Sequence, residues 1–448
     1  MRLAIPTLAL LVALFLYFRR PPMYVAYTLW VWFLTPLVRR LVDWKFGWQE
    51  QSLILLSPHL VASVALLSIL IPSRKNSSRI PPAFVLCAAG VLYGFVIGIF
   101  VHRSMEVAYG LLNWMAPLLF GAHLAINWKH YERNRDILLK CFVWGAGVMG
   151  LYGIYQFFFA PPWDTFWLQN VSSGLIDPSF GQPEPMLIRV WSTLNAPGAF
   201  AGVMTTALLL LTVASSSLKI PFAIAGYLAF LLTAVRAAWL GWIVGLVLML
   251  RKARPKLLVR ILGSMVLVAL CVIPIVENPQ LAPMIGDRLK TLTDLKQDGS
   301  FRERQDMYRV VTGVILHEPF GHGLRNQEIV HNLAVDSGIL TTLLSLGWLG
   351  TLLYIGGVAV FIFQSGKAES ANPFTNACRA VCFASLAQYV GGNIFVNVGG
   401  AVFWICAGGA LAGNQWQLAE ASHFQAEAKP EDYWTQVVPP ISTVSTFR

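Results

Sequence analysis

Three side chains in the second half of the chain have the chemistry needed to transfer a group from a diphosphate. Arg236 lies in TAVRAAWLGW (233–242), Arg304 in FRERQDMYRVVTGVI (301–315) and His331 in HNLAVDSGIL (331–340). If the donor is a glycan on a lipid diphosphate, two guanidinium groups can stabilise the dianionic leaving group in place of a metal ion. A neutral imidazole, with an ordinary pKa near about 6.5, can remove the proton of an acceptor hydroxyl. These three residues are therefore the candidate catalytic residues.

The spacing of apolar residues in 301–315 predicts a helix. Arg304 precedes Met307 by three residues and Val311 by seven, so it is expected to point into the protein with the apolar stripe. Arg302 lies on another face with Arg309 and Asp306, an arrangement typical of a solvated charge cluster. The full apolar stripe is Met307, Val310, Val311, Val314 and Ile315.

The HEPFGHG stretch should end this helix, because Pro319 stops a helix and Gly321 and Gly323 permit a tight turn. His322 is either a substrate ligand or a turn residue. His331 opens the segment expected to return to the membrane. A structural histidine at the lipid boundary is the alternative to a catalytic one.

The elements that position these residues belong to a very apolar chain. It has 448 residues, of which 56% are hydrophobic and 12% are charged, and its mean hydropathy is +0.60. An ordinary soluble domain has roughly 25% charged residues, so the composition predicts a polytopic membrane protein. The net charge of +11 reflects Lys and Arg clustered in short loops and is not read as nucleic-acid binding.

Thirteen apolar stretches approach the roughly 20 residues that cross a bilayer, which predicts an all-α protein with 12 or 13 transmembrane helices. Residues 1–412 should form the transmembrane domain and 413–448 a polar, partly disordered cytoplasmic tail. All six cysteines fall in apolar stretches, so neither disulfides nor a metal site are expected. The stretches are 3–18, 23–38, 53–71, 83–101, 111–126, 137–159, 197–214, 220–234, 237–250, 257–275, 338–363, 378–395 and 396–412.

Basic loops near 74–79, 129–135 and 251–256 predict the orientation. The positive-inside rule places them in the cytoplasm, so the intervals 160–196 and 276–337 lie on the exported face, the second as a large helical loop. Arg39 and Arg40 conflict with this alternation, which puts them outside. Either the first two apolar stretches form a shallow hairpin or the pair has a local role.

On this topology Arg236 lies at the exported boundary, where basic anchors are uncommon, although a snorkelling anchor is the alternative. The exported interval 160–196 contains Arg189 and several aromatic residues, including Trp163 and Trp167. These rings either stack on sugars or form the aromatic belt of the membrane interface.

At these residues the sequence resembles the O-antigen ligase and polymerase family, multispanning enzymes that use undecaprenyl-diphosphate-linked glycans on the periplasmic face of the bacterial inner membrane. The similarity covers mainly 190–363 and rests on the VRAAWLG joint, the Arg304-x-x-x-Tyr308 helix, the HEPFGHG turn and the HN...GIL segment. Two positions depart from the family: Val330, where a small polar residue is common, and Asp336, where Glu is frequent.

The resemblance implies a GT-C-like helical fold and an inverting, metal-independent glycosyltransferase without a cofactor. In that scheme Arg236 and Arg304 bind the lipid diphosphate and His331 activates the acceptor. Further substrate contacts are expected from a second group of residues, which comprises Arg189, Arg302, Tyr308, His322 and Asn332.

Family members polymerise repeat units, ligate finished glycan to lipid A core or transfer glycan to protein. Protein-transferring members resemble longer chains, and the motifs do not separate polymerase from ligase. We favour an O-antigen, capsule or exopolysaccharide polymerase, because the sequence has no identifiable site for a core lipid. The expected partners are the lipid-linked donor, a glycan or lipid A-core acceptor, the bilayer and, for a polymerase, a chain-length regulator.

Two other classes of function remain open at this point. A transporter of lipid-linked glycan would also use exported arginines, but it would be expected to carry inverted repeats, and no internal repeat is visible in the sequence. A scaffold of an envelope assembly would use the long exported loop as a docking surface.

Overall fold

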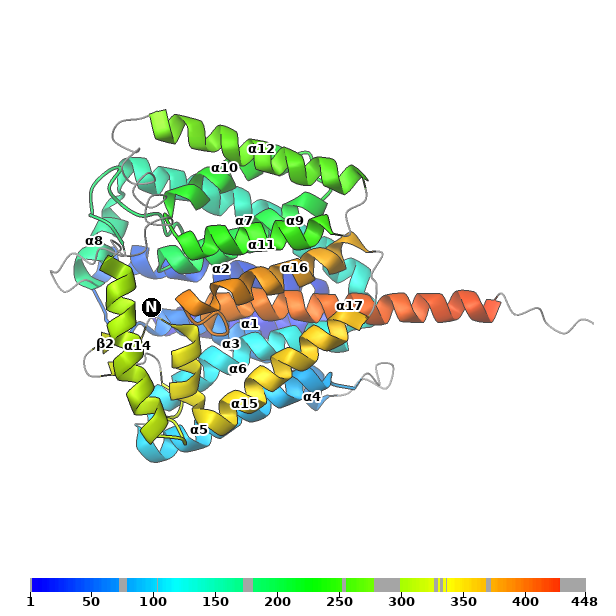
Figure 1. Cartoon of the computed structure of the whole chain (residues 1–448), viewed down its shortest axis with the longest axis horizontal. Coiled ribbons are helices and arrows are strands. Elements are labelled where there is room, and N and C mark those ends of the chain that lie inside the picture. The colour runs from blue at the N-terminus through cyan, green and yellow to red at the C-terminus, as the bar shows by residue number, and fades with distance from the viewer. Residues whose placement is uncertain are drawn as a thin grey trace, which may run out of the picture.

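The computed structural model describes residues 2–71, 79–102, 104–171, 180–251, 255–277, 299–325, 329–330, 333–335, 337–367 and 372–427. Nearly all of this structure is helical, and most of the long helices run from one end of a bundle to the other (Figure 1). The strands in this part of the chain are a two-residue antiparallel pair, β1 (Ile329–Val330) and β2 (Leu333–Ala334). The predicted all-α fold is confirmed.

Each predicted apolar stretch coincides with helical structure. The stretch 53–71 is a series of short pieces, η1 (Leu53–Leu56), α3 (Ser57–Ser63), η2 (Val64–Leu66) and α4 (Leu67–Leu70). The other twelve are α1 (Ala4–Arg19), α2 (Pro21–Phe46), α5 (Pro82–Val101), α6 (Ser104–Ile126), α7 (Tyr131–Phe159), α9 (Pro197–Val213), α10 (Lys219–Leu232), α11 (Arg236–Leu250), α12 (Pro255–Glu277), α15 (Gly338–Lys367), α16 (Pro373–Gln388) and α17 (Asn397–Glu427).

Five helical segments of the described chain are long and apolar enough to cross a membrane, and they begin at Leu53, Pro82, Met105, Trp128 and Gly338. Shorter apolar helices accompany them, among them α1, α9, α10 and α11. The chain is therefore a multi-pass membrane protein.

Small residues allow the closest helix crossings. Gly121 of α6 faces Gly408 of α17, and Gly90 of α5 faces Gly350 of α15, so closely that an added Cβ would collide with the opposite backbone. Lipid tails are as apolar as the helices, so association depends on close packing and dispersion contacts more than on the hydrophobic effect. These crossings bind α6 to α17 and α5 to α15.

The two ends of the bundle differ. The N-terminus, α8 (Pro162–Val171) and α14 (Gly299–His317) lie at one end, called here the α14 end, and α14 runs across the long helices (Figure 1). The C-terminal part of α17 projects from the other, the α17 end. Helix α17 continues to Glu427, well past residue 412 where the predicted span stops. The Gln, Leu, Ala and Glu residues after Gly413 favour helix, so the predicted tail begins inside a helix, and 428–448 lie outside the described residues.

The HEPFGHG turn follows α14 as the sequence predicts, since the helix ends at His317, before Pro319. The turn depends on glycine, with φ of 79° at Gly321 and 80° at Gly323. Gly321 packs on Gly347, and Gly323 packs on Gly98 of α5. The turn is thereby held between α5 and α15.

The predicted span at 338–363 is confirmed as an apolar helix long enough to cross a membrane. Helix α15 is nevertheless broken at Gly347, where φ is 60° and ψ is −174°. The part before the break packs against α14, with Leu340 and Leu344 buried beside Met307 and Val311. The part after it, 348–367, is long enough at about 1.5 Å per residue to cross a bilayer alone. Glycine adopts the required positive φ without strain, which explains why the bend occurs there.

Most of the predicted stripe of α14 is confirmed. Met307, Val311 and Ile315 are buried against α15, and Val314 is partly buried. Val310 does not belong to the stripe, since it is 38% exposed. The contact with α15 is a narrow i, i+4, i+8 seam, and Val310 lies to one side of it.

Replacing Gly323 with alanine is expected to lower the free energy of unfolding by about 2–4 kcal/mol, since it adds both positive-φ strain and overpacking. The new Cβ would collide with the backbone of Gly98. Thermal unfolding in detergent, followed by tryptophan fluorescence, measures the loss. Gly313→Ala is the matched control, because nothing lies within 4 Å of an added Cβ there and alanine favours helix. Equal melting temperatures for the two variants would contradict the role of the turn.

Candidate functional site

Arg236 is the first residue of α11 and is half-buried at the α14 end. The joint before it has a positive φ of 51° at Ala234 and extended backbone at Val235. The start of a helix carries partial positive charge, so a cation there is disfavoured by about 0.3–1 kcal/mol unless an anion is nearby. The start of α11 is therefore a favourable place for a negatively charged group beside Arg236.

Arg189 holds this joint in place. Its guanidinium donates hydrogen bonds to the carbonyl oxygens of Thr233, at 3.1 Å, and Ala234, at 3.2 Å. The backbone N–H of Val190 donates to the Leu232 carbonyl at 3.2 Å. Arg189, predicted as a substrate contact, thus lies against the backbone that positions Arg236.

A chain of contacts links the start of α11 to α14. Gly391, in η5 (Tyr389–Gly391), lies against Ala237, with 3.4 Å between an added Cβ and the Ala237 Cβ. Gly338, at the start of α15, packs closely on Tyr389. These three elements therefore meet at the α14 end.

The contact chain continues from α15 to α14 through hydroxyl groups. The Tyr389 hydroxyl donates to Thr342 Oγ1 at 2.5 Å, which ties η5 to α15. The Tyr308 hydroxyl lies 2.7 Å from Ser337 Oγ, which ties α14 to the residue before α15. Tyr308, predicted as a substrate contact, thus lies at the junction of α14 and α15.

The structure describes some of the remaining predicted residues fully, some only by their backbone and some not at all. Arg302 and Arg304 lie in α14, but their side chains are outside the described part of the chain, and His331 and Asn332 are outside the described residues altogether. His322 Nε2 lies 2.7 Å from Glu318 Oε2 of the same turn, and the His322 backbone N–H donates to the Leu344 carbonyl of α15 at 2.6 Å.

A buried ion pair anchors the 160–196 interval near this site. Arg40 Nε lies 3.1 Å from Asp164 Oδ1, and both side chains are fully buried. Arg40 also donates to the carbonyl oxygens of Ser192 and Leu194. Asp164 accepts hydrogen bonds from Tyr152, at 2.9 Å, and Gln156, at 2.7 Å. The local role for Arg40 is therefore the alternative that the structure supports.

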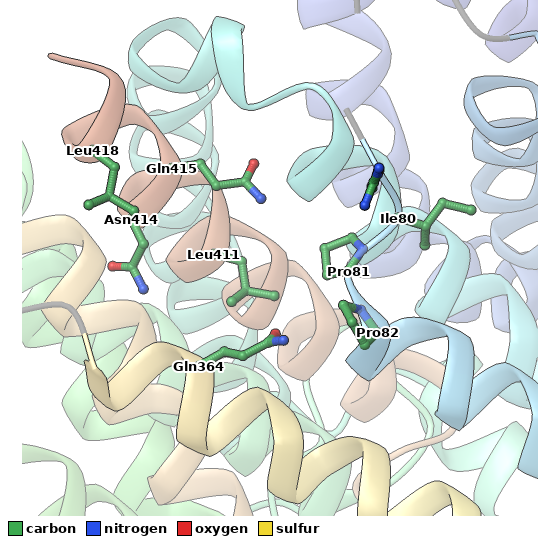
Figure 2. Close-up of a pocket in the computed structure, with 9 residues that line it drawn as sticks. Ile80, Pro81, Pro82, Gln364, Leu411, Asn414, Gln415 and Leu418 are labelled. Carbon is green, nitrogen blue, oxygen red and sulfur yellow. The ribbon is translucent and has the colours of Figure 1, made fainter. Parts of the chain in front are cut away.

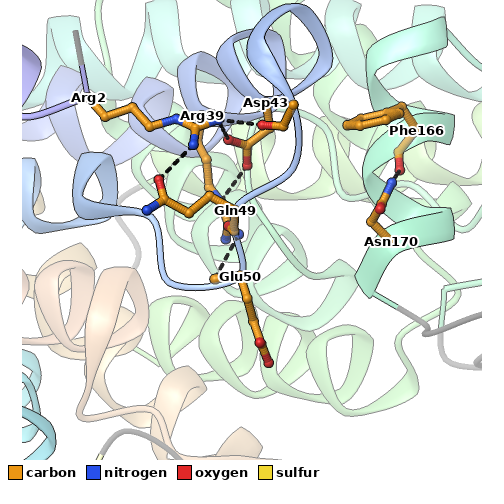
Figure 3. Close-up of polar contacts among 8 residues, drawn as sticks. Arg2, Arg39, Asp43, Gln49, Glu50, Phe166 and Asn170 are labelled. Atoms are coloured by element: carbon orange, nitrogen blue, oxygen red, sulfur yellow. Dashed lines mark hydrogen bonds and ion pairs between the residues drawn. The ribbon is translucent and has the colours of Figure 1, made fainter.

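Arg39 has a separate local role at the end of α2 (Figure 3). Its Nε donates to Asp43 Oδ2 at 3.1 Å, and its Nη2 donates to the backbone carbonyls of Gln49 and Glu50. Arg2 contacts the same Asp43 carboxylate at 3.1 Å. Both arginines of the pair thus have partners, which removes their conflict with the positive-inside rule.

Aromatic residues of the 160–196 interval form a small core. Trp167 and Trp191 are 2% and 0% exposed and pack with Phe180. A buried ring cannot stack on a sugar, so the stacking role considered for Trp167 is wrong. Trp163 is half-buried and donates to the Tyr152 hydroxyl at 2.6 Å.

Several polar atoms near the candidate site were not singled out from the sequence as ligands. Asn393 Nδ2, Asn195 Oδ1 and Trp239 Nε1 are buried and have no hydrogen-bond partner among the described residues. Such groups are costly unless something satisfies them. The sequence did not identify Asn393 as a ligand, because an amide in an apolar segment predicts interhelical bonding as well as ligand binding.

Comparison with known proteins agrees with this part of the chain. A family model described as O-antigen ligase matches residues 221–355, a range that contains Arg236, Arg304 and His331. A search of curated proteins finds no match. The resemblance seen in the sequence is thus confirmed over α11, α14 and the first part of α15. Residues 221–355 of this multi-pass membrane protein are therefore similar to the O-antigen ligase family.

Proposed function

We propose that the chain is an inverting, metal-independent glycosyltransferase of the bacterial inner membrane. It takes glycan from an undecaprenyl diphosphate donor at the periplasmic face and polymerises repeat units of O-antigen, capsule or exopolysaccharide. Ligation to lipid A core is the second candidate. The observation that carries the proposal is the placement of Arg236 at the start of α11, inside the range that matches the O-antigen ligase family.

The proposed reaction is a single displacement. The acceptor hydroxyl oxygen attacks the anomeric carbon while its proton passes to the His331 imidazole, and the bond from that carbon to the diphosphate oxygen breaks. The leaving diphosphate takes the bonding electrons and is stabilised by Arg236, Arg304 and the positive start of α11. One displacement inverts the anomeric configuration.

Contacts near the site support this reading. Arg189 fixes the backbone before Arg236, and Tyr308 and Ser337 fix α14 against α15. Electrostatic catalysis needs groups that are already in place when charge develops. The hydrogen bonds around the joint meet that requirement for Arg236.

Purified protein incubated with lipid-linked glycan and a metal chelator is the direct test. We expect glycan transfer to continue in the chelator. Longer lipid-linked glycan from donor alone indicates a polymerase, whereas product only after addition of lipid A core indicates a ligase. Movement of donor across liposomes without a covalent product would overturn the proposal in favour of a transporter.

His331→Ala is expected to lower the transfer rate about a hundredfold, since a general base contributes at least that much. Initial rates at saturating donor measure the loss. His317→Ala is the control, because His317 is an exposed histidine at the end of α14. Undiminished transfer by the His331 variant would show that another group removes the proton.

A further inference from the structure

A cavity of about 430 Å³ lies at the α17 end, where α5 begins and α15 ends. It is far from the α14 end, so it is separate from the candidate catalytic site. Figure 2 shows Gln364, Asn414 and Gln415 around it, opposite Pro81 and Pro82. Its volume is within the range of sites for small molecules. The lining residues are Arg79, Ile80, Pro81, Pro82, Gln364, Leu411, Asn414, Gln415 and Leu418.

The cavity contains buried polar atoms that call for a ligand. Asn414 is 5% exposed, and its Oδ1 accepts a hydrogen bond from Arg379 at 2.5 Å. Its Nδ2 has no partner in the described part of the chain, and neither has the buried Gln415 Oε1. An amide whose oxygen is already bonded presents its N–H groups as donors. Asn414 therefore offers donors where Arg79 adds a positive charge.

The depth of the cavity suits a lipid headgroup. The membrane-spanning part of α5 begins at Pro82, so Arg79 lies just outside the apolar layer. Lipid phosphates lie at this boundary, where basic side chains attract them. Apolar side chains, among them Ile80 and Leu411, line the cavity together with these polar groups.

We propose that this cavity binds the phosphate group of an anionic membrane lipid. Arg79 pairs with the phosphate, Asn414 Nδ2 donates a hydrogen bond to it, and Gln415 Oε1 accepts one from a headgroup hydroxyl. The apolar lining holds the glycerol and the first methylenes of the lipid. The site tethers α5, α15 and α17 at the end of the bundle opposite the candidate active site.

The test uses the full chain, delipidated in a neutral detergent and titrated with dioctanoylphosphatidylglycerol. Tryptophan fluorescence during thermal unfolding reports binding. Arg79→Gln and Asn414→Asp are expected to weaken binding at least about tenfold, because each removes a hydrogen bond to a charged group. Asn414→Asp keeps the acceptor for Arg379 and replaces only the donor. Arg251→Gln is the matched control and should bind normally, because Arg251 is an exposed arginine that follows the last residue of α11 and does not line the cavity.

Two further ligands identify the source of the phosphate. Dioctanoylglycerol lacks phosphate and should not bind, and glycerol phosphate lacks acyl chains and should bind at least about tenfold more weakly than the lipid. Glycerol phosphate binding as tightly as the lipid would overturn the assignment to a membrane lipid. Equal lipid binding by all three variants and the unmodified protein would overturn the site itself.

Discussion

Arg236→Ala is expected to lower glycan transfer by about 10²–10³-fold while leaving the melting temperature of the protein nearly unchanged. Removing one preorganised donor to a developing negative charge typically has an effect of this size. Arg236 is half-buried at the start of α11 and is not a member of the apolar clusters of the described residues. The effect should therefore fall on the reaction rate and not on folding.

The conservative variant separates charge from geometry. Arg236→Lys keeps the charge but loses the planar fork that bonds two phosphate oxygens together. It should transfer faster than the alanine variant and more slowly than the unmodified protein. Arg309→Ala is the matched control, because Arg309 is an exposed arginine of α14. Equal rates for Arg236→Ala and Arg309→Ala would refute a role for Arg236 in the reaction.

Arg40→Met should lower the free energy of unfolding by about 3–5 kcal/mol, the usual result of leaving one member of a buried ion pair alone. Asp164 would remain fully buried, with only Tyr152 and Gln156 as donors. The lost guanidinium also leaves the Ser192 and Leu194 carbonyls without a donor. Thermal unfolding in detergent measures the loss.

A second substitution distinguishes the buried charge from lost packing. Asp164→Asn added to Arg40→Met keeps an acceptor for Tyr152 and Gln156 but removes the charge, so it should restore about half of the lost stability. Arg135→Met is the control, since Arg135 pairs with Asp136 at the surface and exposed pairs contribute about 0–1 kcal/mol. If the double variant is less stable than Arg40→Met, the unpaired charge is not the cause.

The loss in Arg40→Met should also depend on pH. Burial raises the pKa of Asp164, and the adjacent Arg40 guanidinium opposes that rise. Without Arg40 the folded-state pKa lies further above the unfolded value, so the folded protein binds more protons between the two values. Stability then falls as pH rises through that window. Unfolding measured from acid to neutral pH should show a deficit that grows with pH.

Both predictions concern the end of the bundle where residues from distant segments converge. Arg40 of α2 meets Asp164 of α8, and Arg189 meets the joint before Arg236. The first pair fixes the 160–196 interval, and the second fixes the start of α11. Loss of the Arg40–Asp164 pair should therefore also disturb the Arg189 contacts, because Arg40 and Arg189 are both connected to the 188–196 segment.

The sequence by itself determined the helices and their apolar content, because a helix that crosses a membrane needs about 20 apolar residues in a row, and such a run is visible in the sequence. It also predicted the α14 helix, the end of that helix before Pro319 and the resemblance carried by Arg236, Arg304 and His331. Each of these rests on neighbouring residues in the chain. Only the tertiary structure decided the break at Gly347, the burial of Trp167 and the exposure of Val310.

The ion partners also required the fold. Arg40 and Asp164 are distant in sequence, and nothing in the spacing of either residue predicts the other. From the sequence alone, the basic pair at 39–40 therefore conflicts with the predicted topology, and only the fold shows the acidic partners of the two arginines. The same holds for Arg79 and Asn414, which come from opposite ends of the chain and line one cavity. Local periodicity fixes which face of a helix is apolar, whereas a polar partner depends on which helices pack together, and that is set by the whole chain.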